Sequence, residues 1–194
     1  MKVALQKVEL NKLKNKYVLK SDVRKYYASI DHEILLSPIR KIIPESRFVG
    51  LIYQFLKHVR YRDGYYVEVE KGISRGTSLS PLLGALYLST FDRAMEKMNV
   101  TYVRFVDDWV VMSDNRRTFS RAIKKVYRIL SSLKLEKSKD KTFIGKIDRG
   151  FDFLGFYFGK EGRTIAKKTV LKFAERIAVR LYKAGYDRNE FKGG

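Results

Sequence analysis

The residues of this sequence best suited to chemistry are two adjacent carboxylates, Asp107 and Asp108. They lie between two short runs, residues 102–106 and 109–112, whose valine and aromatic content is typical of β-strands joined by a tight turn. Carboxylates at a turn tip are good ligands for a hard cation such as Mg²⁺. Asp22 ends a similar run, residues 17–21. If these three carboxylates meet in space, the site can hold two metal ions and catalyse phosphoryl transfer.

The adjacent aspartates also have a simpler interpretation. Asp-Asp is common in turns, because Asp bonds its own backbone and tolerates unusual dihedral angles. On that interpretation Asp108 is a plain turn residue. The chain contains 41 Lys and Arg against 21 Asp and Glu, yet it places carboxylates at strand ends. This placement favours the metal site.

The charge of the chain indicates its class of partner. The formal net charge is +20 over 194 residues, and basic residues occur throughout rather than in one tail. A charge of this size predicts affinity for polyanions, and its spread suits a groove that follows a nucleic-acid backbone. The alternative is a solvated basic surface without a partner.

Several classes of site are excluded by composition. The sequence has no Cys, which excludes disulfides and thiolate metal sites. It has two His, His32 and His58, which argues against a His-based zinc site or a Ser-His-Asp triad. No run is apolar enough to span a membrane and no signal peptide is visible. We therefore expect an intracellular, cytoplasmic protein with no membrane partner.

The hydrophobic pattern predicts helices that alternate with strands and hairpins. Asp31 is expected to cap a short helix that Pro38 breaks, and Ser80 with Pro81 to open a helix that runs to about Met98. A first hairpin is expected to turn at Asp63-Gly64. The other predicted elements are helices at 2–14, 46–58, 116–133 and 164–184, a strand at 17–22, and a second hairpin of strands 142–147 and 151–158 turned at 148–150.

This order of elements indicates an α+β fold, with an antiparallel sheet and helices packed on one face. The best boundary is at residues 159–162, where a hairpin gives way to a basic helix. The chain is thus divided into residues 1–159 and 160–194.

Beyond these elements, a series of motifs in order resembles the palm of a reverse transcriptase, closest to bacterial group II intron and group II-like enzymes. The resemblance covers about residues 17–158. Two departures stand out, since group II enzymes usually carry Gln where this chain has Arg75 and more often Tyr where it has Phe105. The matching motifs are Ser21–His32, Gly72–Leu83, Phe105–Asp108, Leu135–Lys141 and Phe153–Gly155.

The resemblance implies a polymerase palm with a ferredoxin-like antiparallel sheet, followed by the start of a helical thumb. It implies RNA-directed synthesis of DNA from dNTPs on an RNA template and a DNA or RNA primer. Asp22, Asp107 and Asp108 would be catalytic, and two Mg²⁺ ions, for which Mn²⁺ is a possible substitute, would be held by them with the backbone of Val23.

The resemblance also assigns binding roles to other residues. Tyr27 matches the aromatic that blocks a sugar 2′-hydroxyl, although a core aromatic is the alternative. Phe105 keeps the aromatic ring near the primer without a hydroxyl. Nucleotide-binding roles fall to Tyr27, Arg75, Gly76 and Lys141, and primer or template contacts to Gly72, Phe105, Phe153, Leu154 and Gly155.

The last predicted helix has a basic face of its own. Lys168, Lys172 and Arg176 recur at four-residue spacing and can lie along a phosphate backbone. A solvated helix without a partner is the rival interpretation.

Only about twenty residues precede Asp22, so we expect the fingers region of the family to be largely missing. Fingers or thumb segments, or a partner protein, could then act in trans. Two other functions stay open from the sequence. One is a non-catalytic nucleic-acid-binding or maturase-like fragment, inactive without fingers. The other is a different palm-type nucleotidyl transferase, against which Tyr27 and residues 153–155 weigh.

Overall fold

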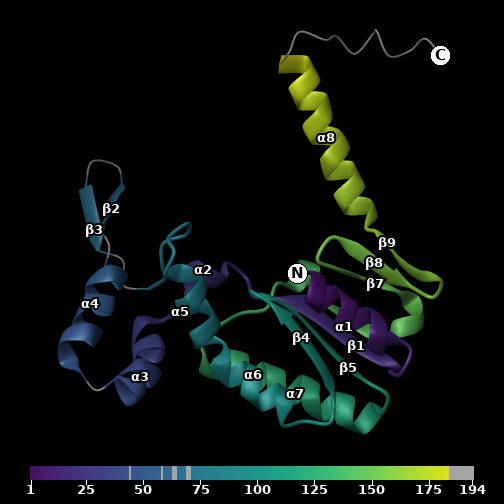
Figure 1. Ribbon diagram of the computed structural model, residues 1–194, viewed down its shortest axis with the longest axis horizontal. Coiled ribbons are helices and arrows are strands. Elements are labelled where there is room, and N and C mark those ends of the chain that lie inside the picture. Colours follow the sequence, from purple (N-terminus) through teal and green to yellow (C-terminus); the bar gives the residue numbers. More distant parts are fainter. Residues whose placement is uncertain (44, 58, 63–64, 69–70, 184–194) are drawn as a thin grey trace.

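The computed structural model describes residues 1–43, 45–57, 59–62, 65–68 and 71–183. Its centre is an antiparallel sheet of four strands in the order β4-β5-β1-β6 (Figure 1). The strands are β1 (Tyr17–Asp22), β4 (Thr101–Phe105), β5 (Asp108–Ser113) and β6 (Phe143–Lys146). The predicted α+β class and antiparallel sheet are confirmed.

Helices cover one face of this sheet, as predicted. They are α5 (Ser80–Tyr87), α6 (Ser89–Glu96) and α7 (Arg116–Ser132). In α7 the buried Phe119, Ala122, Val126, Ile129 and Leu130 recur at helical spacing and form one core with Leu19, Trp109 and Val111 of the sheet. Because strand side chains alternate between the two faces of a sheet, the residues of β1 and β5 in this core are every second residue along each strand.

The other face is covered too, which the sequence did not predict. Val18, Val110 and Met112 point to it and form a second core. Over them lie α1 (Lys2–Lys12), through Leu5 and Val8, and a three-stranded sheet. That sheet consists of β7 (Phe151–Phe153), β8 (Phe156–Gly159) and β9 (Gly162–Ile165).

Between β1 and α5 the chain forms a lateral extension (Figure 1). It contains α2 (Tyr26–Ser29), α3 (His32–Ile42), α4 (Ser46–Leu56) and a hairpin of β2 (Val59–Arg62) and β3 (Tyr65–Glu68). The predicted turn Asp63-Gly64 lies outside the described residues. Asp31 caps α3 by accepting a hydrogen bond from the Ile34 amide at 3.1 Å, as expected.

Three predictions of element boundaries are wrong. Pro38 lies inside α3 rather than ending it, because burial of Leu35, Leu36 and Ile39 outweighs the roughly 3 kcal/mol that an internal proline costs. The helix predicted from Ser80 to Met98 is two helices that meet at Leu88.

The third is the second hairpin. β6 pairs with β1 instead of β7, and residues 147–149 form a short 3₁₀ turn. The hairpin in this region joins β7 to β8, and it turns at Leu154-Gly155, where φ is 49° and 83°. A leucine in the left-handed region is uncommon, so Gly155 is the one turn signal that residue type gives at this position.

The last helix, α8 (Lys167–Lys183), extends away from the rest of the chain and has no buried residue (Figure 1). The predicted boundary at residues 159–162 falls inside the three-stranded sheet, because the chain turns there into β9 and the helix begins only at Lys167. Within the described ranges, no helix has the length and apolar character needed to cross a bilayer.

Candidate functional site

The three predicted carboxylates meet at one end of the central sheet. Asp22 and Asp108 are direct partners in the β1–β5 register. Asp107 lies in the two-residue turn between β4 and β5, and its carbonyl accepts a hydrogen bond from the Val23 amide at 3.2 Å. The structure therefore brings together Asp22, Val23, Asp107 and Asp108, as the sequence predicted.

The environment of Asp22 suits a carboxylate that binds a cation. The residue is 3% exposed, and its Oδ1 atom is buried without a hydrogen-bond partner. Its Oδ2 atom accepts a hydrogen bond from the ammonium of Lys141. An unpartnered buried carboxylate oxygen is costly, since it has lost water and gained nothing. A cation bound at this oxygen would remove that cost.

The neighbouring carboxylates are also held in an unfavourable state. Burial raises the pKa of Asp107 above its usual value, and the charge of Asp22 raises it further. Burial also raises the pKa of Asp108, and the charges of Asp107 and Asp22 add to this. Three carboxylates near one another and partly dehydrated repel one another unless a positive ion lies between them.

These donors fit Mg²⁺, although not as a complete cage. In the part of the chain that the structure describes, no group of three His, Cys, Asp or Glu side chains is arranged around a metal position. Mg²⁺ is usually held by one or two carboxylates, with water and substrate phosphates completing the shell. The all-oxygen donor set and the orphaned Asp22 Oδ1 agree with that mode of binding.

A half-buried ion pair fixes the turn that carries the aspartates. Arg104 on β4 donates to both carboxylate oxygens of Asp92 on α6, with 2.7 Å from Nε to Oδ1, and also donates to the Val106 carbonyl at 2.7 Å. Val106 has a φ of 58°, which a β-branched residue adopts at a cost of about 1–3 kcal/mol. The Asp92–Arg104–Val106 contacts hold the turn in this strained shape, and sequence reasoning missed them.

We expect Arg104→Gln to destabilise the protein by about 1–3 kcal/mol, because Asp92 would lose its paired donor while remaining partly buried. Thermal and urea unfolding would measure this. Arg93→Gln, an exposed arginine on the same helix as Asp92, is the control and should change the free energy of unfolding by less than about 0.5 kcal/mol. Equal effects of both substitutions would contradict the positioning role.

The two tyrosines after Asp22 differ in burial. Tyr26 is buried and its hydroxyl donates to the Gly84 carbonyl. Tyr27 is half-buried and packs against the same core. A Cβ on Gly84 would lie 3.3 Å from both rings, so the glycine lets α5 approach them closely. Gly84 is a second residue that sequence reasoning missed, and its one signal was a glycine inside an apolar helix.

The predicted Gly-rich loop is attached to the segment after β1. Gly72 is buried with φ 90°, and a Cβ there would meet the backbone of Ala28 at 3.0 Å. Its amide donates to the Ile30 carbonyl at 2.7 Å. Gly72 thus anchors the loop instead of facing solvent, whereas Arg75 and Gly76 are exposed. The charge of Arg75 lowers the pKa of Asp107 against the larger effect of burial, which places this arginine on the carboxylate side.

A groove beside the carboxylates collects most of the remaining predicted residues. Phe153 is buried in the second core, and Thr169 on α8 donates to the Gly155 carbonyl at 3.0 Å, which ties the β7–β8 turn to the helix. Lys20 also lines the groove, and its charge lowers the pKa of Asp108, a role that sequence reasoning missed. The predicted residues in the lining are Asp108, Lys141, Phe153, Leu154, Gly155, Lys168 and Lys172.

Of the predicted residues not yet described, Phe105 and Arg176 lie outside this lining. Phe105 is half-buried and pairs with Asp108 across the turn. Arg176 is exposed one turn further along α8, where its Nε donates to the Lys172 carbonyl at 3.3 Å. The site is therefore a row of acidic strand ends beside a groove with a basic rim.

Comparisons with known proteins agree with this arrangement. The sequence profile of the reverse transcriptase (RNA-dependent DNA polymerase) family matches residues 3–158. Protein YkfC of Escherichia coli is 25% identical over 188 residues, which cover 79% of this chain and 49% of YkfC. The group II intron-encoded protein LtrA of Lactococcus lactis is 25% identical over 122 residues, or 63% of this chain and 20% of LtrA.

Solved structures show the same fold. Apo telomerase of Candida tropicalis, truncated from its C-terminal domain, matches with a TM-score of 0.67 and 16% identity, over 85% of this chain and 40% of that one. Telomerase of Candida albicans in complex with a telomeric RNA fragment matches with a TM-score of 0.64 and 14% identity, over 81% of this chain and 32% of that one.

The chain belongs to the reverse transcriptase family. Its similarity to LtrA is consistent with the group II-like type. It spans about half or less of the length of the relatives and structures named above.

Proposed function

We propose that this chain is the palm of an RNA-directed DNA polymerase that transfers nucleotides from dNTPs to a primer 3′-hydroxyl. The observation that carries the proposal is the meeting of Asp22, Asp107 and Asp108 at paired strand ends, with a buried, unpartnered Asp22 oxygen among them. The complex of Candida albicans telomerase with a telomeric RNA fragment supports an RNA partner. Residues 1–159 would form the palm, and residues 160–194 the start of a thumb.

Bound Mg²⁺ would neutralise charge on the triphosphate and lower the pKa of the primer hydroxyl. Asp22 and Asp107 would hold the ions, with the Val23 backbone as a further oxygen donor, and Asp108 would complete the negative field. Lys141 is the cation already at this site, and its Nζ contacts Asp22. We propose that it turns to the phosphates of the bound nucleotide once metal ions occupy the carboxylates, with Mn²⁺ as a substitute ion.

The groove would seat the primer and template. Gly155 and Leu154 form its turn, and Lys168 and Lys172 of α8 reach phosphates along it. Arg176 extends the basic row, and Phe105 lies beside the aspartates at the primer end. Arg75 and Gly76, exposed on the opposite loop, would contact the nascent pair. Gly72 would support this contact by anchoring the loop.

Tyr27 would set the sugar preference, because a ring under the sugar clashes with a 2′-hydroxyl. We expect Tyr27→Ala to lower the preference for dNTP over NTP at least tenfold, or about 1.4 kcal/mol. Tyr27→Phe keeps the ring and should keep the preference. Single-nucleotide incorporation with dATP and ATP measures both, and an unchanged ratio in Tyr27→Ala would assign the ring to the core alone.

The function itself is tested by primer extension on an RNA template with Mg²⁺. The expected result is incorporation of the nucleotide complementary to each template base, with loss of the product in EDTA. Duplex binding that is sensitive to salt but unaffected by EDTA, with no incorporation, would instead identify a nucleic-acid-binding protein without polymerase activity.

A further inference from the structure

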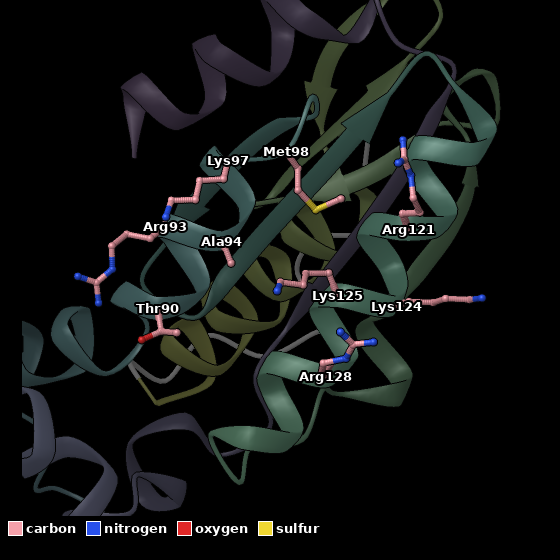
Figure 2. Close-up of a pocket in the computed structure, with 9 residues that line it drawn as sticks. All are labelled: Thr90, Arg93, Ala94, Lys97, Met98, Arg121, Lys124, Lys125 and Arg128. Atoms are coloured by element: carbon pink, nitrogen blue, oxygen red, sulfur yellow. The ribbon is translucent and has the colours of Figure 1, made fainter.

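A second basic groove lies between α6 and α7, with a volume of about 680 Å³ (Figure 2). The amine of Lys125 points from α7 towards α6, while Lys124 points away (Figure 2). Most of the lining residues are cations, contributed by both helices. The lining consists of Thr90, Arg93, Ala94, Lys97, Met98, Arg121, Lys124, Lys125 and Arg128.

No carboxylate neutralises these cations in the described part of the chain. None of them forms an ion pair there. Arg93 donates a hydrogen bond to the Ser89 hydroxyl at 3.4 Å, and Arg121 donates one to the Thr118 hydroxyl at 3.3 Å. The sequence of α7 contains no acidic residue. On α6, Asp92 is engaged by Arg104, and Glu96 is exposed outside the lining. The groove therefore carries an uncompensated positive field.

The groove is separate from the carboxylate site. α7 packs on the sheet face of Leu19 and Val111, whereas Asp108 shares the face of Val110, because alternate residues point the same way. The two grooves have no lining residue in common. In Figure 1, α6 and α7 lie on the side of the sheet away from β7–β9.

The lining indicates the chemistry of the ligand. It contains no aromatic side chain, so unpaired bases would find no ring to stack on. Its only apolar members are Ala94 and Met98, too few to insert into a lipid surface. Arg121, Lys125 and Arg128 extend over about 10 Å of α7, at 1.5 Å per residue. Two facing rows of cations with little else match the phosphates of a backbone.

We propose that the α6–α7 groove binds the phosphodiester backbone of a nucleic-acid helix, independently of sequence and in addition to the template–primer duplex. The bound segment is held by Arg93 and Lys97 on one side and by Arg121, Lys125 and Arg128 on the other. The proposal goes beyond the polymerase function and depends on none of its catalytic residues.

The test measures how many labelled 16-base-pair RNA hairpins bind per chain, and their affinity as a function of salt. The wild type is expected to bind two. Lys125→Glu/Arg128→Glu should bind one hairpin tightly, and its second site should be at least tenfold weaker. The slope of log affinity against log salt concentration should be smaller by about two. Arg116→Glu/Arg117→Glu makes the same change of charge on exposed α7 residues outside the groove, and should keep both sites. A DNA hairpin distinguishes the two backbones.

The proposal would be overturned if both charge-reversal variants lost the same affinity for the hairpin, or if Lys125→Glu/Arg128→Glu still bound two hairpins. Tighter binding of an acidic protein than of either hairpin at the groove would overturn it as well. Lys125→Gln/Arg128→Gln repeats the test without added negative charge if melting shows that the first variant is misfolded. Primer extension at saturating template–primer is measured in parallel and should be unchanged in the groove variants. Extension absent from the wild type, with two hairpins bound, would contradict the polymerase function alone.

Discussion

Replacing Asp107 and Asp108 by asparagine is expected to abolish nucleotide transfer and, without metal, to make the protein more stable. The loss of transfer should be at least about 1000-fold, or about 4 kcal/mol of transition-state stabilisation, because neither asparagine can hold a divalent ion with charge. The gain in stability should be about 0.5–2 kcal/mol at pH 7. Both effects have one cause, which is the loss of two negative charges that repel each other in the absence of metal ions and bind the ions when they are present.

The sign of the stability change follows from the pKa directions. Burial and like charge raise the pKa of Asp107 and Asp108 in the folded state above the usual value of 3.8. Between 3.8 and the raised value, the folded protein therefore binds more protons than the unfolded chain. Stability falls as pH rises through this window, and the penalty is complete above it. The asparagine variant has no such penalty, so its advantage should disappear below about pH 3.8.

Thermal unfolding in EDTA at pH 7 and at acidic pH measures this difference. Mg²⁺ should raise the melting temperature of the wild type and leave Asp107→Asn/Asp108→Asn unchanged, by linkage of binding to folding. Asp148→Asn, which removes an exposed carboxylate far along the chain, is the matched control and should shift neither value. A variant less stable than the wild type at pH 7 would show that the carboxylates are satisfied without metal.

Lys141→Met is expected to destabilise the protein in the absence of metal ions. Asp22 would lose the ammonium that contacts Oδ2 and remain buried with both oxygens unpaired. We expect a loss of about 1–3 kcal/mol in the free energy of unfolding. Because Lys141 and a metal ion compete for the same carboxylate, Mg²⁺ should stabilise Lys141→Met more than it stabilises the wild type.

Urea unfolding with and without Mg²⁺ tests the lysine. The bond to Asp22 raises the pKa of Lys141, so its contribution should be complete below the usual pKa of 10.5 and be lost as pH rises through the folded value. Lys139→Met changes an exposed lysine two residues away and should alter stability by less than about 0.5 kcal/mol. Identical Mg²⁺ responses in Lys141→Met and the wild type would rule out the competition.

The acidic site was predictable because its signals are local. Asp107-Asp108 between valine-rich runs predicts a hairpin turn, which the structure places one residue earlier, at Val106-Asp107, with Asp108 as the first residue of β5. Asp22, at the end of a third run, meets this turn once β1 pairs with β5. The period of α7 was equally clear, since its buried residues recur every three or four positions. In each case the residue pattern within one segment predicts the secondary structure of that segment, and the tertiary contacts agree with the prediction.

Contacts between distant segments were not predictable in this way. The Arg104–Asp92 pair joins β4 to α6 and supports a strained Val106, and neither residue type signals its partner. β6 was assigned to a hairpin with β7 because the two are neighbours in sequence, yet its edge pairs with β1, more than a hundred residues earlier. The hydrophobic pattern did not locate the turn at Leu154-Gly155, which only the resemblance indicated, because the turn needs a left-handed leucine that packing imposes and propensity does not.

The proposed function depends above all on the carboxylates at the ends of β1 and β5, which would hold metal ions for nucleotide transfer. Single-turnover incorporation of one dNTP on an RNA template, with Mg²⁺ varied, compares the wild type directly with Asp107→Asn/Asp108→Asn. We expect a rate that rises to saturation with Mg²⁺ in the wild type and no product in the variant, although the variant folds and binds the duplex. Incorporation by the variant at a comparable rate would show that these carboxylates do not hold the catalytic metal ions.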